Sequence, residues 1–204
     1  MICSIKKRFR GFLPVIVDVE TTGTNPYQHG LLEMCVVLIQ MDETGNYFPS
    51  QTFAEHILPF EGAALDPESL AFNKIDPYYP LRFAVDEHQA LKNLFAPIKE
   101  AVKAAQCQRA VLVGHNAWFD LLFVKNAAER SKLKLPFHAF TCFDTATLSA
   151  LCYGQTVLAK ALKEANIHFD PTQAHSAIYD AEKTAALFCT ILNHYQGKIL
   201  NKAT

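Results

Sequence analysis

Val15-Ile16-Val17-Asp18-Val19-Glu20-Thr21-Thr22-Gly23 decides the fold, because an apolar run leads to two acids and then breaks at glycine. Runs of Val and Ile of this length are typical of a strand buried on both faces. Since side chains alternate along a strand, Asp18 and Glu20 point to the same face. Two carboxylates so close repel each other, and a divalent cation such as Mg²⁺, which prefers oxygen ligands, relieves that repulsion. The pattern favours a metal site; the alternative is a strand that ends by Asp18, with both acids in a solvated turn.

Composition places the chain among folded proteins of a single domain. Its 204 residues are 50% hydrophobic and 19% charged, which excludes a disordered chain and suits one sizeable core. We expect one domain over residues 1–204, with a basic segment at 1–12 and a loose tail at 196–204. No apolar run approaches the roughly 20 residues that span a bilayer, and the N-terminus lacks an apolar signal core. Six scattered cysteines without a C-x-x-C pair indicate a reducing, cytoplasmic setting.

The net charge of −1 argues neither for nor against a polyanionic partner. Basic residues gather in three groups: Lys6, Lys7, Arg8 and Arg10; Lys99, Lys103 and Arg109; and Lys125, Arg130, Lys132 and Lys134. Each group alone is best explained as a solvated face. Acids concentrated in one site, with bases spread outside it, would fit a metal-dependent enzyme that acts on nucleic acid.

The order of elements predicts an α/β fold. We expect strands at the first motif and at residues 30–41, 52–58, 110–114 and 137–143. We expect helices at 67–72 (capped by Asp66), 87–105, from an Asn116 cap to about 130, after an Asp144 cap, at 156–165 and at 176–195. Three strands with short joins, followed by alternating helices and strands, predict a mixed β-sheet flanked by helices.

Asp120 is the next acid of interest, in the first turn of a helix that directly follows a strand. The helix dipole alone would favour an acid there. Beside it, Trp118 and Phe119 place at least one aromatic ring near the helix N-terminus, where a base could stack.

The last helix carries a fourth acid on an apolar flank. Its buried stripe is predicted to contain Ile178, Ala181, Ala185, Phe188, Leu192 and Tyr195, flanked by Leu187 and Ile191. Asp180 falls with that flank, and a carboxylate there needs a partner, either a shared metal or a buried salt bridge. His175 is expected in the loop before the helix, where a histidine suits a general base near neutral pH.

With these segments identified, the chain resembles the DEDDh exonuclease family of the RNase H-like fold. Its motif D-x-E-x-T-G is met by Asp18, Glu20, Thr22 and Gly23, the second motif by residues 115–120, and H-x-x-x-x-D by His175 and Asp180. Each motif is weak alone, but the ordered set is specific. The resemblance covers nearly the whole chain and extends to residues 8–12, 67–73, 127–130, 154–158 and 170–177.

The resemblance implies a Mg²⁺-dependent 3′→5′ exoribonuclease that trims single-stranded 3′ ends of stable RNAs, tRNA included, and that can also process single-stranded DNA. It implies two Mg²⁺ ions, with Mn²⁺ as an alternative, held by Asp18, Glu20, Asp120 and Asp180. His175 would take the proton of the attacking water, releasing nucleoside 5′-monophosphates. It also implies a homodimer in which basic residues of one subunit hold RNA entering the other. The candidates are Lys6, Lys7, Arg8, Arg10, Lys103, Arg109 and Lys134.

The same resemblance implies residues that contact the terminal bases. Stacking rings map to Phe72, Phe119 and Phe140, and a base-edge contact maps to Glu68; Thr21 and Thr22 are further candidate contacts. Without the resemblance, core packing explains Phe72 and Phe140 equally well. The chain departs from the family at Thr24, where a further stacking Phe is expected; this departure affects terminal-base preference and not catalysis. The alternatives are an oligoribonuclease, a DNA proofreading subunit, or a nucleic-acid-binding protein whose nuclease site has decayed.

Overall fold

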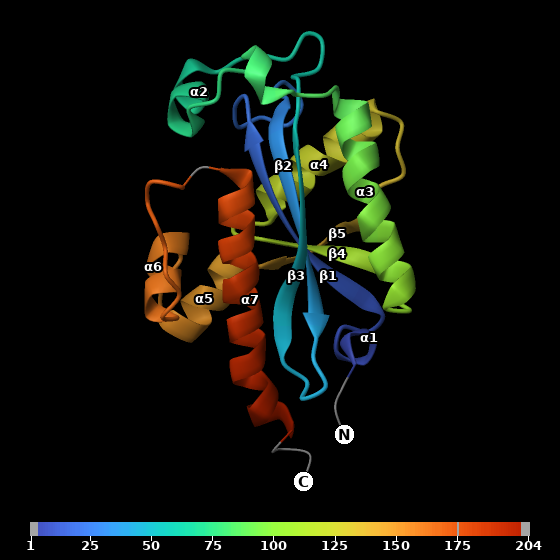
Figure 1. Cartoon of the computed structure of the whole chain (residues 1–204), viewed down its shortest axis with the longest axis vertical. Coiled ribbons are helices and arrows are strands. Elements are labelled where there is room, and N and C mark those ends of the chain that lie inside the picture. Colours follow the sequence, from blue (N-terminus) through green and yellow to red (C-terminus); the bar gives the residue numbers. More distant parts are fainter. Residues whose placement is uncertain (1–3, 175, 201–204) are drawn as a thin grey trace.

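A mixed five-stranded sheet forms the centre of the molecule (Figure 1). The computed structural model describes residues 4–174 and 176–200, and side chains as far as residue 195. The strands are β1 (Phe12–Thr21), β2 (Leu31–Met41), β3 (Tyr47–His56), β4 (Arg109–Gly114) and β5 (Phe137–Asp144). Their order is β3-β2-β1-β4-β5; β1, β2 and β3 are antiparallel neighbours, whereas β4 is parallel to β1 and β5. The predicted mixed α/β sheet is confirmed.

Helices cover both faces of this sheet. They are α1 (Ile5–Arg8), α2 (Pro67–Asn73), the 3-10 turn η1 (Pro80–Arg82), α3 (Glu87–Ala104), α4 (Trp118–Arg130), α5 (Thr145–Tyr153), α6 (Leu158–Glu164) and α7 (Ala177–Leu200). In Figure 1, α7 crosses one face, α3 and α4 lie on the other, and α2 stands at the end toward which β1 points. Within residues 4–174 and 176–200, no helix combines the length and the apolar character needed to cross a membrane.

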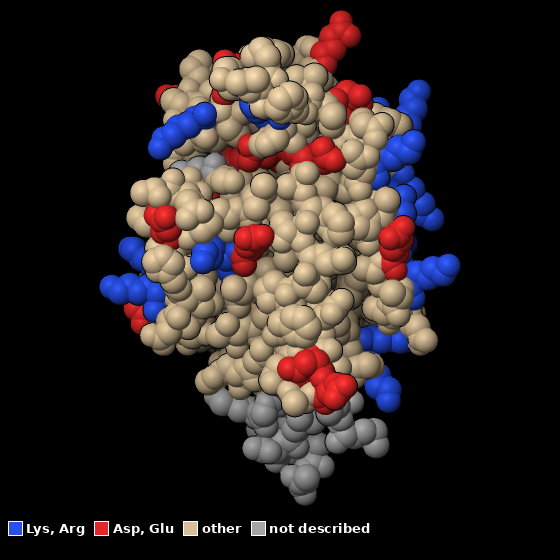
Figure 2. Space-filling model, viewed as in Figure 1, with Lys and Arg blue, Asp and Glu red and all other residues tan. Residues whose placement is uncertain are grey.

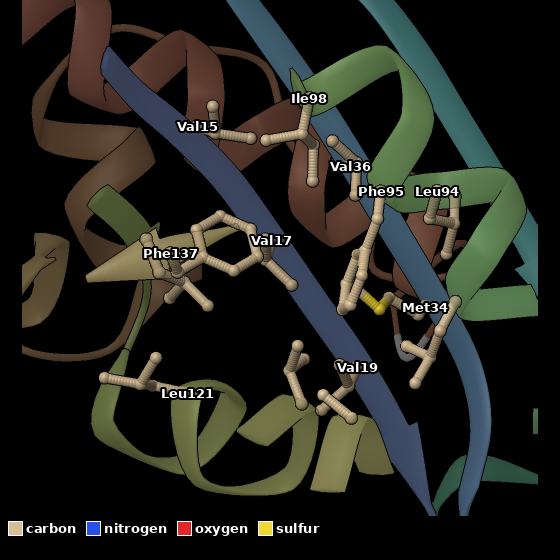
Figure 3. Close-up of a cluster of buried hydrophobic side chains, with 14 of the residues drawn as sticks. Val15, Val17, Val19, Met34, Val36, Leu94, Phe95, Ile98, Leu121 and Phe137 are labelled. Atoms are coloured by element: carbon tan, nitrogen blue, oxygen red, sulfur yellow. The ribbon is translucent and has the colours of Figure 1, made fainter. Parts of the chain in front are cut away.

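The alternation along β1 divides the core in two. Val15, Val17 and Val19 face the cluster that includes Phe95 of α3 and Leu121 of α4 (Figure 3). Ile16 instead belongs to the cluster built on α7. Because β1 is buried on both faces, its apolar run is continuous rather than alternating, as predicted from sequence. The next even-numbered positions, 18 and 20, therefore face the α7 side of the sheet.

Two element boundaries differ from the sequence expectation because of contacts between segments that are distant in the chain. β3 begins at Tyr47 instead of residue 52, since Tyr47 pairs with Met41 directly after the predicted turn, and an irregular register admits Pro49. Asn116 does not cap α4: its φ of 67° places it in a left-handed turn. The carboxylate of Asp144 accepts hydrogen bonds from the N–H groups of Asn116 (2.8 Å) and Ala117 (3.4 Å) instead.

The C-terminal helices also differ in extent. α6 begins at Leu158, two residues later than expected. α7 continues to Leu200, so the expected loose tail does not start at 196; residues 201–204 lie outside the described part. Ile178 was predicted in the buried stripe but is 41% exposed, because it lies in the first turn of α7. The rest of the stripe is buried from Ala181 to Leu192.

Arg130 is a structural residue and not part of a solvated basic face. Its guanidinium pairs with Glu87 at 2.7 Å, donates to the Pro26 carbonyl at 3.3 Å and lies 4.1 Å from the centre of the Phe60 ring. These contacts join the end of α4 to the start of α3 and to the loops beside α2. The cysteines at 35, 107, 142, 152 and 189 are free thiols.

Candidate active site

Four carboxylates from three elements line one cleft at the carboxyl end of β1. Asp18 and Glu20 come from β1, Asp120 from α4 and Asp180 from α7. The cleft has a volume of about 910 Å³. The structure therefore brings together the four acids that the sequence singled out. Its lining also includes His115 and Asn116, the aromatic residues Phe72, Trp118 and Phe119, and Glu68, Thr21 and Thr24.

Asp120 is fixed to the strand that carries the first two acids. Its Oδ1 accepts a hydrogen bond from the backbone N–H of Val19 at 3.1 Å. The last β4 partner of β1 is Ile16, so β1 runs past β4 and its later N–H groups on that side need other acceptors. Gly114 makes room for this contact, because a Cβ there would lie 2.9 Å from Asp120 Oδ2 and 3.1 Å from Ala117 Cα.

Burial, together with neighbouring acids, raises the pKa values of three of these carboxylates. Burial, followed by the charges of Asp120, Glu20, Asp180 and Glu33, raises the pKa of Asp18 well above its ordinary range. Burial, followed by the charges of Glu33, Asp180 and Asp120, raises the pKa of Glu20 to about 8. Burial also raises the pKa of Asp120 to about 8. The protein alone thus leaves this negative charge poorly compensated, which is the situation that a bound cation relieves.

The donor set fits a hard divalent cation. All four groups are carboxylates, the ligands that Mg²⁺ and Mn²⁺ prefer. Among the described residues, no three His, Cys, Asp or Glu side chains form a ready-made metal cluster. That arrangement is compatible with Mg²⁺, which usually takes one or two protein carboxylates together with waters and substrate phosphate rather than an all-protein cage.

Glu33 does not line the cleft, but its charge raises the pKa values of Asp18 and Glu20, and the sequence reasoning missed it. It pairs with Glu20 across β1 and β2, and its carboxylate lies 3.0 Å from His56 Nδ1 of β3. It also accepts a hydrogen bond from the N–H of Ala177, the first residue of α7, at 3.3 Å. Glu33 therefore fastens the beginning of α7, and with it Asp180, to the sheet. A lone charge within the apolar run 31–39 is the sequence signal that could have identified it.

Two hydrogen bonds to backbone carbonyls of residues 21 and 22 hold α2 beside the cleft. The side-chain amide of Asn73 donates to the Thr21 carbonyl at 3.0 Å, and the N–H of Asp66 donates to the Thr22 carbonyl at 2.8 Å. This attachment places Glu68 and Phe72 at the cleft. Phe72 is 63% exposed, so core packing does not explain it. Asn73 was not singled out from sequence, because its role depends on this tertiary contact.

Three of the residues predicted for the catalytic cleft do not reach it or cannot be placed in it. Phe140 is 82% exposed and packs against His138, at 4.5 Å between ring centres, so it is neither a core residue nor part of the cleft lining. Thr22 is fully buried: its hydroxyl donates to the Ala64 carbonyl and accepts from the Gly30 N–H, so it is not placed as a substrate contact. His175 lies outside the described residues. Met1 to Cys3 are likewise not described.

His115, the first residue of the second motif, is held by its neighbours. Its Nδ1 lies 3.0 Å from Thr145 Oγ1 and its Nε2 lies 2.8 Å from the Thr156 carbonyl. Burial lowers its pKa below the ordinary value. Because both ring nitrogens have partners, His115 supports the cleft wall.

The basic candidates gather at the end of β1 opposite the acids. Arg8 and Arg10 precede Phe12, and Arg109 pairs with Phe12 in the sheet. Lys103 is in the last turn of α3, and Lys134 lies shortly before β5. At about 3.3 Å per residue, the stretch of β1 from residue 12 to residue 20 places roughly 26 Å between these bases and Glu20. In Figure 2, lysines and arginines lie mainly along the two sides of the face shown, and the charged residues nearer its middle are mostly acidic.

Comparison with known proteins identifies the family. A family model described as an exonuclease (RNase_T) matches residues 15–188. Ribonuclease T of Vibrio vulnificus is 57% identical over 196 residues, covering 95% of this chain and 90% of that protein. Ribonuclease T of Cronobacter sakazakii is 53% identical, covering 94% and 86%.

Solved structures support the fold. E. coli exonuclease I in complex with a dT13 oligonucleotide superposes with a TM-score of 0.69 at 16% identity, and a full-length 3′-exonuclease with 0.69 at 20%. The chain spans 43% and 62% of those two chains, so this likeness concerns a shared domain. It confirms the predicted RNase H-like fold. The match of the family model and the identity to these relatives establish that the chain belongs to the exonuclease family that includes ribonuclease T.

Proposed function

We propose that this protein is a metal-dependent 3′→5′ exoribonuclease that trims single-stranded 3′ ends of structured, stable RNAs. Turnover of tRNA ends and 3′ maturation of tRNA and rRNA are the reactions it would serve, with single-stranded DNA 3′ ends as further substrates. The observation that carries this proposal is the meeting of four carboxylates from β1, α4 and α7 in one cleft with exposed aromatic rings. The family supports the same reaction. The free thiols fit a cytoplasmic protein.

Asp18, Glu20, Asp120 and Asp180 would hold two divalent cations, with Mg²⁺ favoured and Mn²⁺ as the alternative. When bound, the cations would compensate the acids and withdraw charge from the scissile phosphate. The chain itself contributes the placement of the acids: the Val19–Asp120 hydrogen bond sets α4 against β1, and Glu33 sets α7 against β2. His175, five residues before Asp180, would accept the proton of the attacking water.

The RNA end would be held by rings and by one acid on α2. Phe72 and Phe119 line the cleft beside the carboxylates, and Glu68 is exposed on the same wall. Stacking on such rings tolerates any base, because every base has a π-face. Thr24 also lines the cleft and offers no ring, so we expect weaker discrimination among terminal bases than a third ring would give.

A homodimer would explain the separation of bases and acids. An RNA whose 3′ end is held in the cleft reaches the bases at the far end of β1 in the same subunit only if the RNA strand extends across roughly 26 Å. If a second subunit presents Arg10, Lys103, Arg109 and Lys134 to the cleft, each active site is completed by its partner. Exposed lysine and arginine contacts to phosphates predict affinity that falls steeply with salt.

A comparison of three substrates tests the proposed function against its relatives. Purified protein is given a dinucleotide, a DNA primer with a 3′ mismatch, and a tRNA with its single-stranded 3′ end. Preferential release of nucleoside 5′-monophosphates from the tRNA end supports the proposal. Preference for the dinucleotide would identify an oligoribonuclease, and preference for the mismatch a proofreading subunit. Binding of all three without cleavage would identify a decayed enzyme.

A further inference from the structure

Trp118 is a large exposed ring in the wall of the cleft. The proposed reaction gives it no role of its own. It is the single tryptophan of the chain and the first residue of α4. It lines the cleft and is 60% exposed. An indole left in water beside a nucleic-acid cleft is available to cover a base, and base stacking on such a ring is tolerant of sequence.

The surroundings hold this ring in a defined position. The Phe119 ring meets it edge to face, with centres 6.0 Å apart and planes at 88°. Phe119 itself packs against Phe123 of the core at 4.8 Å. The start of α4 is fixed by Asp144 from one side, and Asp120 fixes it to β1. The platform is therefore largely ordered before nucleic acid arrives, which reduces the entropic cost of binding.

Depth within the cleft separates the role of Trp118 from that of Phe119. Asp120 is 4% exposed, Phe119 is half-buried, and Trp118 is mostly exposed at the surface end of the same wall. A 3′ end whose scissile phosphate reaches the carboxylates places its last nucleotide inside the cleft. The RNA strand must then leave past the surface end of the wall, where the exposed Trp118 ring meets a base on the 5′ side of the scissile phosphate.

We propose that Trp118 stacks on a base upstream of the scissile phosphate and so determines how tightly a single-stranded 3′ end is held. This inference rests on the proposed function. Removing a stacking ring typically weakens binding by about 5- to 150-fold per base. The loss should appear in KM and in the required overhang length, with kcat close to the original value on long overhangs, because Trp118 lies away from the reacting atoms.

The single tryptophan gives a direct test. The variant Asp180→Asn, which is expected to bind without cleaving, is kept in Mg²⁺ and excited where tyrosine does not absorb. Its emission is followed during addition of a nucleoside 5′-monophosphate and of single-stranded RNAs of increasing length. Fluorescence anisotropy of a 5′-labelled RNA measures binding independently. We expect saturable quenching that is small for the mononucleotide, grows with the next nucleotides and follows the anisotropy.

Each other outcome contradicts the inference in a distinguishable way. Binding by anisotropy with unchanged tryptophan emission would place the strand away from Trp118, although the proposed function would stand. Full quenching by the mononucleotide would assign the ring to the terminal base. Absence of binding to any RNA would overturn the proposed function together with this inference.

Substitutions of Trp118 test how much its ring contributes to RNA binding. Trp118→Leu keeps apolar bulk but removes the π-face, and Trp118→Phe restores a ring. We expect a KM increase of about 5- to 150-fold for the first and partial recovery for the second, with thermal melting unchanged because the side chain is exposed. Phe48→Leu, at an exposed ring of β3 outside the cleft, is the matched control. Equal KM values for Trp118→Leu and the original protein would refute stacking.

Discussion

The carboxylate of Asp120 accepts a hydrogen bond from the backbone N–H of Val19 at 3.1 Å, between the two acids of β1. The two residues are 101 positions apart in the chain. This contact fixes the distance between the first and second acid motifs, because α4 cannot shift along β1 without breaking it. A neutral residue would be cheaper to bury in this first turn, and an amide oxygen could accept the same hydrogen bond, so the proposed cation site is what requires an acid here.

Asp120→Asn separates the role of the charge from that of the hydrogen bond. The amide oxygen can still accept from Val19, so we expect the fold to be preserved and the melting temperature in EDTA not to fall. The charge toward the cations is lost, and we expect kcat to fall on the order of 100-fold or more. Glu129→Gln on the same helix outside the cleft is the control. Activity of Asp120→Asn within a fewfold of the original would remove Asp120 from the proposed metal ligands.

The raised pKa values predict how stability depends on pH without cations. The pKa of Glu20 is about 8 in the folded protein and 4.5 ordinarily, so folding favours its protonated form. That contribution is fully present below about pH 4.5 and is lost as pH rises through about 8. In EDTA, the melting temperature should therefore fall between about pH 5 and 8, by roughly 2–4 °C for each kcal/mol lost.

Two variations of the melting experiment test whether ionisation of the buried acids causes the fall in melting temperature. Adding Mg²⁺ should raise the melting temperature more at pH 8 than at pH 5, because protonated carboxylates bind cations poorly. Glu20→Gln should flatten the decline in EDTA. A melting temperature that rises from pH 5 to pH 8 in EDTA would show that the acids are compensated by the protein itself.

Gly114→Ala tests whether close packing positions Asp120. The added methyl would lie 2.9 Å from Asp120 Oδ2 and 3.1 Å from Ala117 Cα, so either the carboxylate or the turn into α4 must move. We expect kcat to fall by about 10- to 100-fold, as for other displaced supporting groups. Gly62→Ala, which adds a methyl into open space at a φ of +82°, should cost stability but spare kcat. Equal kcat for the two variants would contradict the steric argument.

Glu33 is predicted to act by positioning α7. Glu33→Ala removes the acceptor for the Ala177 N–H and the partner of His56, and we expect kcat to fall about 10- to 100-fold while KM changes little. Glu33→Gln retains a carbonyl oxygen as acceptor and should recover much of the activity. Steady-state kinetics on a 3′-overhang RNA distinguish the two. An unchanged kcat in Glu33→Ala would show that α7 needs no such attachment.

Mixed dimers test whether bases act across subunits. Asp180→Asn lacks a carboxylate but keeps its bases, and the double variant Arg109→Ala with Lys103→Ala keeps its acids. If one subunit's bases serve the other's cleft, each mixed dimer has one complete site of two, so random mixing of these two impaired proteins should restore about a quarter of the activity of the same amount of original protein. No recovery after subunit exchange, verified by light scattering and mass, would place both functions in one subunit.

The periodicity of apolar residues predicted the features of the site that depend on local sequence. The alternation through β1 placed Asp18 and Glu20 on one face, and helical spacing placed Asp180 beside the buried stripe. Glu33 and Asn73 were missed, because their roles depend on which strand or turn lies opposite. Phe140 was assigned by resemblance, but an irregular register between β4 and β5 precedes Cys142 and the ring lies outside the cleft.

Incubation of an RNA duplex bearing a single-stranded 3′ overhang tests the central claim most directly. The purified protein, Asp180→Asn and the control Glu164→Gln are compared in Mg²⁺ and in EDTA, and products are resolved by length. We predict stepwise shortening of the overhang to near the duplex edge by the original protein and by Glu164→Gln in Mg²⁺, and none in EDTA or by Asp180→Asn. An intact overhang on a duplex that remains bound would contradict the account and identify a nucleic-acid-binding protein.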